Sequence, residues 1–539
     1  MIHLPRTAHR PLHLNNATRR LRGLAFALAS VVAVACAAEP VVETPARALS
    51  ELDPEFWRAK GADALETALA NAPITGATKG IILFVGDGMG VTTITSGRWL
   101  AGELAQTGNS EGHTLHFEDF PNVSLIKTYN VDAQTPDSAG TMSAMMTGVK
   151  TDAGVLSVAA GVERGDCASA AGQRVETLLE QLEARGWATG VVTTTTLTHA
   201  TPAAAYAHSA DRGWENDSRI PRNQRGLGCR DIARQLIEFE IGDGLEVAMG
   251  GGRASFLPND VADPEFPDRT GQRLDGRHLA DEWSRREGAE WVWNLQQMLA
   301  VDDAKTRHLL GLFNPGHMQY ELDRPRDAAS EPSLAQMTRK ALEILQRDED
   351  GYLLIVEGGR IDHAHHATNA KRALRDTVAL ADAVQVADEM TKDDDTLIVV
   401  TADHSHVFSV AGYSSRGNPV LGVVAIDGQP VLAADGKPYT TLGYANGRGG
   451  RLLEPSVDEV GTPAIYGEEI SEQRRIDHDH VDTTADGFYQ ESLVPKGSET
   501  HGGEDVALFA KGPWAHLFTG TAEQSYIYYV MAHAAAAGN

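Results

Sequence analysis

The sequence predicts an α/β fold with one large, mostly parallel central sheet and helices on both faces. Three observations support this prediction. Short runs of apolar and β-branched residues recur along the chain, helical patterns separate them, and several runs end in glycine and an acidic residue. Continuous apolar runs are typical of parallel strands, which helices cover on both faces. The composition, 42% hydrophobic and 22% charged residues, is that of a folded protein.

Five strands are expected along the chain, at residues 81–85, 190–195, 353–356, 396–400 and 506–510. A helical pattern at 174–186 precedes the second strand, and a Met- and Ala-rich helix is expected at 141–147. Residues 405–500 break this pattern because they hold many Gly, Pro and Asp and show little helical periodicity. We therefore expect a catalytic domain formed by residues 51–404 and 501–539, with 405–500 inserted as a hairpin-rich subdomain.

The chain of 539 residues is acidic, with 74 Asp and Glu against 47 Lys and Arg and a formal net charge of −27. The first 36 residues carry five Arg and no acidic residue, so the rest of the chain has a charge of −32. This charge disfavours the wrapping of nucleic acid, which requires cationic side chains to neutralise phosphates. It also disfavours docking on an anionic membrane surface.

Residues 1–36 have the features of an export signal, with a basic start and an apolar run that ends at Ala35. The run is too short for a membrane span. Two interpretations stay open, namely lipoprotein processing with a lipid anchor on Cys36 and ordinary cleavage near Ala35. Arg19-Arg20 hints at a twin-arginine route. Residues 37–50 are a Pro- and Ala-rich linker, and the protein is expected to be periplasmic or secreted.

Export would place Cys167 and Cys229 in an oxidising compartment. A disulfide that closes 61 intervening residues is one interpretation there, and two buried free thiols are the other.

Acidic residues stand at the predicted carboxyl ends of three strands, where ligands bind in open α/β sheets. Asp87, Glu357 and Asp403 each come directly after an apolar run. One such residue is usually a cap or a turn residue. Three of them, two beside histidine clusters, indicate a functional site.

The densest group of metal-ligand side chains is the segment 361–366, IDHAHH. In a helix that begins after Gly358-Gly359, Asp362 and His366 lie four residues apart and share one face. An imidazole and a carboxylate at this spacing suit Zn²⁺, whereas His365 points elsewhere. Further candidate ligands are Asp403, His404 and His501.

Ser138 is the candidate nucleophile, because it lies in a small-residue turn that leads into helix 141–147. A helix N-terminus there would stabilise an anion at the seryl oxygen. The sequence has no Gly-x-Ser-x-Gly elbow, which disfavours a serine–histidine–acid esterase. A metal can replace the general base, because a coordinated oxygen loses its proton readily. The residues thus indicate a multi-metal site with a serine.

Six motifs resemble those of alkaline phosphatases and occur in that family's order. They are FVGDGMG (84–90), TPDSA (135–139), HATPAAAYAH (199–208), VEGGRIDHAHH (356–366), TADHSH (401–406) and ETHGGEDVALFAKGP (499–513). The resemblance runs from about Leu52 onwards. It implies a phosphomonoesterase with the alkaline phosphatase fold and a homodimeric state, in which 405–500 resembles the crown of animal-type enzymes.

The same resemblance implies roles for the site residues. Ser138 would form a phosphoseryl intermediate, and Arg212 would bind phosphate with its planar fork. The implied ligands are Asp362, His366 and His501 for a first Zn²⁺, Asp87, Asp403 and His404 for a second Zn²⁺, and Asp87, Thr201 and Glu357 for a Mg²⁺. The residue types agree with this division, since oxygen-only ligation suits magnesium.

Two positions resemble the animal-type rather than the enteric enzymes. His199 and His363 stand where the enteric type has Asp and Lys. Because both charges are missing, we expect a weaker magnesium shell and less tightly held phosphate.

A fourth, calcium-like site of animal-type enzymes would fall on Glu265, the Phe313 carbonyl, Asn314 and Glu331. Asn314 stands where that family has an acidic residue, so one negative charge is missing and calcium would bind less tightly. Cys167 and Cys229 match a disulfide of the family.

Other functions were weighed against this one. A phosphodiesterase of the same superfamily usually has Thr as nucleophile and lacks the magnesium ligands, and a sulfatase needs a Cys-x-Pro-x-Arg setting that Ser138 lacks. A non-catalytic extracellular metal-binding protein would be favoured by a missing ligand or nucleophile, and none is missing.

Overall fold

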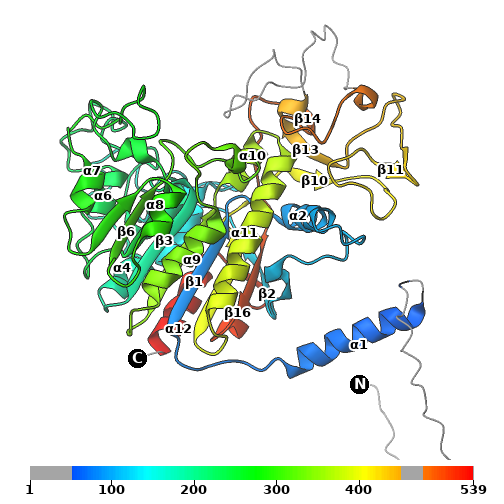
Figure 1. Ribbon diagram of the computed structural model, residues 1–539, viewed down its shortest axis with the longest axis horizontal. Coiled ribbons are helices and arrows are strands. Elements are labelled where there is room, and N and C mark those ends of the chain that lie inside the picture. Colours follow the sequence, from blue (N-terminus) through cyan, green and yellow to red (C-terminus); the bar gives the residue numbers. More distant parts are fainter. Residues whose placement is uncertain (1–50, 52, 451–476, 538–539) are drawn as a thin grey trace, which may run out of the picture. The chain divides into compact units, whose positions relative to one another are not determined.

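Figure 1 shows a computed structural model of the chain, which describes residues 51, 53–450 and 477–537. The expected export signal, the linker and Cys36 lie outside the described residues. The chain divides into two compact units, Met1–Thr67 and Ala68–Asn539. Helix α1 (Pro54–Ala70) begins in the first unit and ends in the second. Across the described residues, no helix is both long enough and apolar enough to cross a membrane.

The second unit is built on a ten-stranded sheet, which confirms the predicted α/β class. Every neighbouring pair in the sheet is parallel except those that involve one strand, β16. The strands, in spatial order, are β17 (Thr521–Glu523), β2 (Asn122–Lys127), β16 (Val506–Lys511), β8 (Thr396–Ala402), β1 (Gly80–Gly86), β7 (Tyr352–Gly358), β3 (Ala188–Thr196), β4 (Val247–Gly251), β6 (His308–Leu312) and β5 (Ala289–Val292).

The strand predicted at 506–510 is antiparallel to both of its neighbours, which corrects the expectation of five parallel strands. The connection that leads into β16 explains why this strand is antiparallel. Short strands β9 (Ser405–His406) and β15 (His501–Gly502) pair with each other just beyond the carboxyl end of β8. Only residues 503–505 separate β15 from β16, so β16 starts at that edge and must run back across the sheet.

Helices cover both faces of the sheet (Figure 1). On one face α2 (Val91–Leu104), α9 (Leu334–Leu345) and α11 (Ala370–Met390) pack against one another. A second group packs together on the opposite face, and its members are α3 (Ser138–Thr147), α4 (Leu178–Glu183), α5 (Ala200–Tyr206) and α12 (Tyr526–Ala537). The remaining helices are α6 (Ile232–Ile237), α7 (Leu279–Trp283), α8 (Leu295–Ala300) and α10 (Arg360–His366). Helix α4 is shorter than the predicted 174–186, because Thr177 caps it through a capping box with Glu180.

The inserted region forms small sheets beyond α10, near the carboxyl ends of the large sheet (Figure 1, yellow to orange). They comprise a three-stranded sheet of β10 (Phe408–Val410), β13 (Leu442–Gly447) and β14 (Glu491–Pro495), and a hairpin of β11 (Ala425–Ile426) and β12 (Gln429–Pro430). Strand β13 pairs with β14 in parallel and with β10 in antiparallel orientation. A long connection, residues 411–441, joins β10 to β13. Within the described part of 405–500, β11–β12 is therefore the one hairpin of consecutive strands.

Cys167 and Cys229 form the predicted disulfide. The bridge packs into a small apolar cluster that is separate from the main core and includes Val155, Trp214 and Ile220. It joins the connection between α3 and α4, which holds Cys167, to the connection between α5 and α6, which holds Cys229.

Candidate active site and metal centre

The carboxyl ends of three neighbouring strands bring the predicted acidic residues together. Strand β1 pairs in register with β7 and β8, so Gly86 lies level with Gly358 and Ala402. Asp87 and Asp403 follow their strands directly, and Glu357 is the penultimate residue of β7. All three carboxylates are fully buried. The sheet therefore gathers three negative charges at one buried edge.

Helix α10 and strand β15 bring a second set of ligand atoms together. Asp362 Oδ1 lies 3.4 Å from His366 Nε2 and 3.3 Å from His501 Nε2. The two histidine nitrogens are 3.0 Å apart. The predicted first zinc ligands thus converge. The four-residue spacing on α10 brings Asp362 and His366 together, and the pairing of β15 with β9 places His501 beside them.

His365 points away from this set, as its helical position predicted. Its Nε2 lies 3.0 Å from the Thr93 hydroxyl, and its Nδ1 lies 2.8 Å from the Tyr444 hydroxyl. Both ring nitrogens therefore connect α10 to neighbouring elements.

The predicted second zinc set also converges. His404 Nε2 lies 3.4 Å from Asp87 Oδ1 and 3.4 Å from Asp403 Oδ2. A tetrahedral zinc with bonds of about 2.0 Å needs ligand atoms about 3.3 Å apart. Both sets match this spacing, so the residues present fit two zinc ions.

A third cluster contains Asp87, Glu357 and His199, whose ligand atoms lie within 4.8 Å of one another. Thr201 is fully buried in the first turn of α5. Among the described residues, four polar atoms of this group have no hydrogen-bond partner, namely Asp87 Oδ2, Glu357 Oε1, Thr201 Oγ1 and His199 Nδ1. Unsatisfied buried oxygens are costly, and a hard cation such as magnesium would satisfy them.

Burial and the neighbouring charges shift the pKa values of the buried carboxylates. Burial, followed by repulsion from Asp403, raises the pKa of Asp87 well above its usual value. Burial raises the pKa of Glu357 to about 7. Asp362 differs, because facing histidines outweigh its burial and hold its pKa well below the usual range. Without metal ions, such a group of buried acids would be destabilising.

Ser138 lies where these clusters meet. It is the first residue of α3, whose N-cap Asp137 accepts a hydrogen bond of 3.1 Å from Gly140 N. Ser138 Oγ lies 3.1 Å from His404 Nε2 and 3.4 Å from Asp87 Oδ1. The hydroxyl therefore lies beside the second zinc set and at a helix N-terminus, which favours negative charge.

Arg212 is fixed beside the turn of the nucleophile. Its Nη1 donates to Asp137 Oδ2 at 3.1 Å, and its Nη2 donates to His199 Nε2 at 3.0 Å. The side chain is half-buried. Arg212 and the Gly140 amide outweigh burial and lower the pKa of Asp137, so this pair stays ionised.

His406 belongs to the site but was given no role from the sequence. Its Nε2 donates to Asp362 Oδ1 at 2.9 Å, and its Nδ1 donates to Glu499 Oε2 at 2.6 Å. Burial alone would lower its pKa, but the two carboxylates raise it to about 10. The sequence contains one indication that His406 lies at the site. His404 and His406 are two residues apart, and side chains at this spacing in an extended segment lie on the same side.

His317 is a second residue that the sequence reasoning missed. It follows β6 in a loop that none of the six motifs covers. Its half-buried ring lies 4.4 Å from that of His363 and 5.6 Å from that of His199, between centroids. No spacing in the sequence indicated this contact.

The four residues of the predicted calcium-like site have protein partners. Arg253 Nη2 donates to Glu265 Oε2 at 2.7 Å. Asn314 Nδ2 donates to Glu331 Oε1 at 2.7 Å, and burial raises the pKa of Glu331 to about 7. Phe313 is fully buried. The carboxylate oxygens are thus already hydrogen-bonded, and this donor set fits calcium less well than the other clusters fit their ions.

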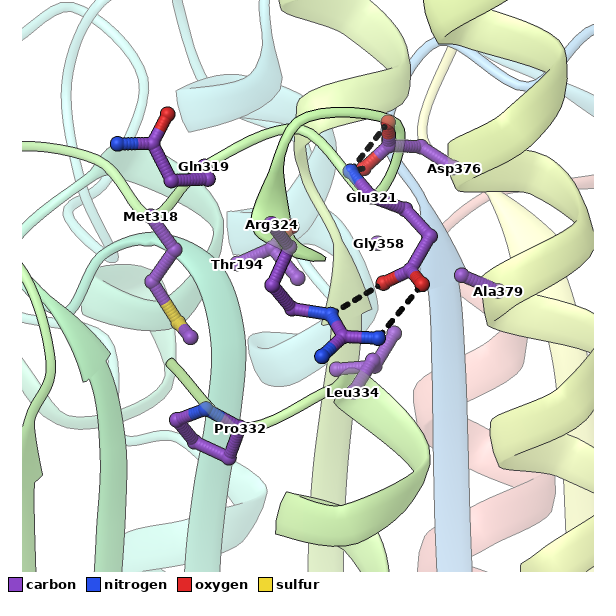
Figure 2. A pocket seen from close by; sticks show the side chains of 10 residues that line it. All are labelled: Thr194, Met318, Gln319, Glu321, Arg324, Pro332, Leu334, Gly358, Asp376 and Ala379. Carbon is purple, nitrogen blue, oxygen red and sulfur yellow. Dashed lines mark hydrogen bonds and ion pairs between the residues drawn. The ribbon is translucent and has the colours of Figure 1, made fainter. Parts of the chain in front are cut away.

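A small pocket lies near the site but is not the catalytic cleft (Figure 2). Arg324 pairs with Glu321 through two bonds of 2.7 Å, and the Asp376 carboxylate accepts from Glu321 N. Burial raises the pKa of Asp376 to about 8. The pocket is lined by Thr194, Met318, Gln319, Glu321, Arg324, Pro332, Leu334, Gly358, Asp376 and Ala379. The Arg324 and Glu321 side chains that line it are thus paired with each other.

The fold and the site together define an α/β metallohydrolase with a serine at a helix N-terminus. Comparison with known proteins then gives the family. Residues 78–537 match the family described as alkaline phosphatase. The chain is 43% identical over 519 residues to the tissue-nonspecific isozyme of alkaline phosphatase from Gallus gallus, over 95% of this chain and 94% of that protein. It is 42% identical over 495 residues to alkaline phosphatase from Gadus morhua, over 90% of this chain and 98% of that protein.

Solved structures agree with the fold. Alkaline phosphatase from Thermus thermophilus matches with a TM-score of 0.60 at 25% identity, over 87% of this chain and 93% of that chain. The enzyme from the Antarctic bacterium TAB5 matches with a TM-score of 0.56 at 21% identity, over 86% and 100%. The chain belongs to the alkaline phosphatase family. It is a phosphoric monoester hydrolase with metal-binding clusters.

Proposed function

We propose that the enzyme transfers the phosphoryl group of a monoester to Ser138 and then to water. The observation that supports this most directly is the position of Ser138 Oγ, 3.1 Å from His404 Nε2 at the N-terminus of α3. Arg212 would bind two non-bridging phosphate oxygens with its planar fork. Asp137 and His199 hold that fork in place from two sides.

The proposed metals are two Zn²⁺ and one Mg²⁺. Asp362, His366 and His501 would hold the first zinc, and Asp87, Asp403 and His404 the second. Asp87, Thr201 and Glu357 would hold the magnesium, with His199 beside them. Bound zinc would supply Lewis-acid stabilisation of the charge that develops on the entering and leaving oxygens.

The chain's own groups then perform the remaining tasks. The hydroxyl of Ser138 must lose its proton before attack, and the N-terminus of α3 stabilises the oxyanion that results. His406 donates to Asp362 and thereby orients that ligand, as the outer partners of metal ligands commonly do. Leaving groups of different chemistry would be accepted, because these contacts would all be made to the phosphate.

The role of Ser138 is tested with Ser138→Ala, assayed on 4-nitrophenyl phosphate, its bis-ester and its sulfate at alkaline pH. Loss of the nucleophile should lower monoester turnover by about 10³-fold or more. Ser143→Ala is the matched control, because Ser143 lies on the same helix and donates within it to Ala139 O. Near-normal turnover in Ser138→Ala would refute the role, and preferred turnover of the bis-ester would favour the phosphodiesterase alternative.

Calcium is proposed only as a weakly bound fourth ion. Its ligands would be Glu265, the Phe313 carbonyl, Asn314 and Glu331. Binding would have to release Glu265 from Arg253 and turn the Asn314 amide away from Glu331, so part of the binding energy would be lost.

We also propose that the enzyme is exported and homodimeric. The Cys167–Cys229 disulfide supports an oxidising compartment, periplasmic or extracellular. The homodimer is proposed from the resemblance of 405–500 to the crown of animal-type enzymes. The domain bounds 51–404, 405–500 and 501–539 are retained as proposals. Lipidation of Cys36 and cleavage near Ala35 stay as alternatives.

A further inference from the structure

His317 is held against strand β3 by backbone contacts on both sides. Thr196 N donates to His317 Nδ1 at 3.0 Å, and Met318 N donates to Thr194 O at 3.0 Å. The preceding Gly316 O accepts from Gly252 N at 2.7 Å. The loop after β6 is therefore attached to its neighbours, and the imidazole cannot swing away without breaking the bond to Thr196.

The contact with Thr196 also fixes the tautomer of His317. Since Nδ1 accepts a hydrogen bond, the single proton of the neutral ring lies on Nε2. Burial and then the charge of Arg360 lower the pKa of His317 to about 3, so the ring stays neutral at any working pH. A ring that is neutral and fixed can act as a rigid wall.

Three histidine rings form one cluster beside the phosphate-binding arginine. The centroid of His317 lies 4.4 Å from that of His363, and the centroids of His199 and His363 lie 5.4 Å apart. His363 Nδ1 accepts from Arg360 Nη1 at 2.7 Å, and His199 Nε2 accepts from Arg212 Nη2 at 3.0 Å. Each ring therefore accepts one hydrogen bond from a fixed donor and packs on the other two.

We infer that His317 is a positioning residue for Arg212, acting through the ring of His199. The imidazole of His317 lies edge to face against the ring of His199, with centroids 5.6 Å apart, and so limits how far that ring can turn away from Arg212. A misplaced guanidinium would hold the phosphate less well, while the two proposed zinc sets and Ser138 would be left in place. This inference rests on the proposed role of Arg212.

The experiment uses three variants that separate the ring from the hydrogen bond. His317→Phe keeps a flat ring without an acceptor, His317→Asn keeps an acceptor near Nδ1 without the ring, and His317→Ala removes both. His116→Ala is the matched control, because His116 is also half-buried but pairs with Asp388 away from the site. The dissociation constant of inorganic phosphate is measured by calorimetry on the metal-loaded protein, together with kcat and KM for 4-nitrophenyl phosphate.

We expect His317→Ala and His317→Asn to weaken phosphate binding and raise KM by about threefold to tenfold, because small misplacements of a binding group are costly. His317→Phe should bind phosphate within about twofold of the wild type, because it keeps the packing. Unchanged phosphate binding in His317→Ala would overturn the inference. Rescue by Asn but not by Phe would also overturn it, since the hydrogen bond to Thr196 would then matter and the ring would not. Arg212→Ala, measured in the same way, makes the two failures distinguishable. If Arg212→Ala weakens phosphate binding and His317→Ala does not, only the inference about His317 fails, whereas unchanged binding in Arg212→Ala would refute the proposed role of Arg212.

Discussion

His199 connects Arg212, the arginine proposed to bind phosphate, to the third candidate metal cluster. Its Nε2 accepts from Arg212, while its Nδ1 is buried and finds no partner in the described structure. Its partner in the cluster, His363, accepts from Arg360. Two neutral rings thus stand at positions where charged side chains would strengthen the binding of magnesium and of phosphate.

Restoring those charges should change product inhibition. In the double variant His199→Asp and His363→Lys, the carboxylate adds a hard ligand beside Asp87 and Glu357, and the ammonium adds a charge for phosphate. We expect the inhibition constant of inorganic phosphate to fall by about tenfold, the size of one charge-assisted hydrogen bond. Steady-state inhibition by phosphate measures this, with the two single variants as controls. An inhibition constant equal to that of the wild type would contradict the explanation.

Most single residues of the site could be predicted because they lie in motifs or at strand ends. Asp87 and Asp403 follow apolar runs, and Asp362 and His366 share a helical spacing. His317 could not be predicted, because it is brought to the site by a loop whose course depends on tertiary contacts. The type of residue at a loop position says little about which distant rings it will meet.

At the scale of elements, a buried acid, Glu183, and a half-buried one, Glu246, lie near the starts of β3 and β4, at the opposite end of these strands from the candidate active site. Glu183 ends α4, and Glu246 directly precedes β4. Thr189 connects them, because its hydroxyl donates to Glu183 and its amide donates to Glu246 Oε2 at 2.6 Å. Burial raises the pKa of Glu183 to about 8, and burial followed by repulsion from Glu183 raises that of Glu246 to about 9. Asp243 and Asp348 add repulsion at Glu183, while Arg286 opposes it.

This pair should weaken the fold at alkaline pH. Because the folded pKa values exceed the unfolded value of 4.5, the pair's stabilisation is fully present below that pH and is lost as pH rises through 8 and 9. Between pH 6 and pH 9.5, we expect the free energy of unfolding of Glu183→Gln to fall by about 1–3 kcal/mol less than that of the wild type. Urea unfolding at both pH values measures this. Equal pH dependence in the wild type and the variant would contradict it, and Glu282→Gln, in a half-buried ion pair with Arg277, is the control.

The direction of an element is harder to predict than its existence. The apolar run at 506–510 indicated a buried strand, and β16 is one. The apolar residues of a strand that is buried on both faces do not encode the direction of that strand. The short connection from β15 determines the direction of β16. The edge strands β5 and β17 are short and partly exposed, so they leave little apolar pattern to detect.

At the scale of the whole molecule, the metal centre ties together distant parts of the chain. The proposed ligands come from β7, from the residues that follow β1 and β8, and from α5, α10 and β15. Four carboxylates of this candidate site are buried, namely Asp87, Glu357, Asp362 and Asp403. Bound cations would therefore contribute to stability as well as to catalysis.

Removal of the metals should lower both activity and thermal stability. Prolonged dialysis against a chelator would leave Asp87, Glu357 and Asp403 to repel one another in a buried site, so the melting temperature should fall by several degrees, on the order of 5 °C. Scanning calorimetry and monoester turnover are measured before dialysis, after it, and after return of zinc and magnesium. An unchanged melting temperature together with full activity in the chelated protein would contradict the assigned site.

The placement of β16 between β8 and β2 has a consequence for the order of biosynthesis. The chain makes β1 early, yet its neighbours β7 and β8 emerge hundreds of residues later, and the gap beside β8 is filled only when residues 501–511 leave the ribosome. Such non-local pairing is slow, and the sheet cannot be completed before β16 and β17 are made. His501 arrives in that same last stretch, so a nascent chain lacks one ligand of the proposed first zinc set. That zinc would therefore be bound only after residue 501 has been made, whereas the residues of the other two proposed sets are all present by His404.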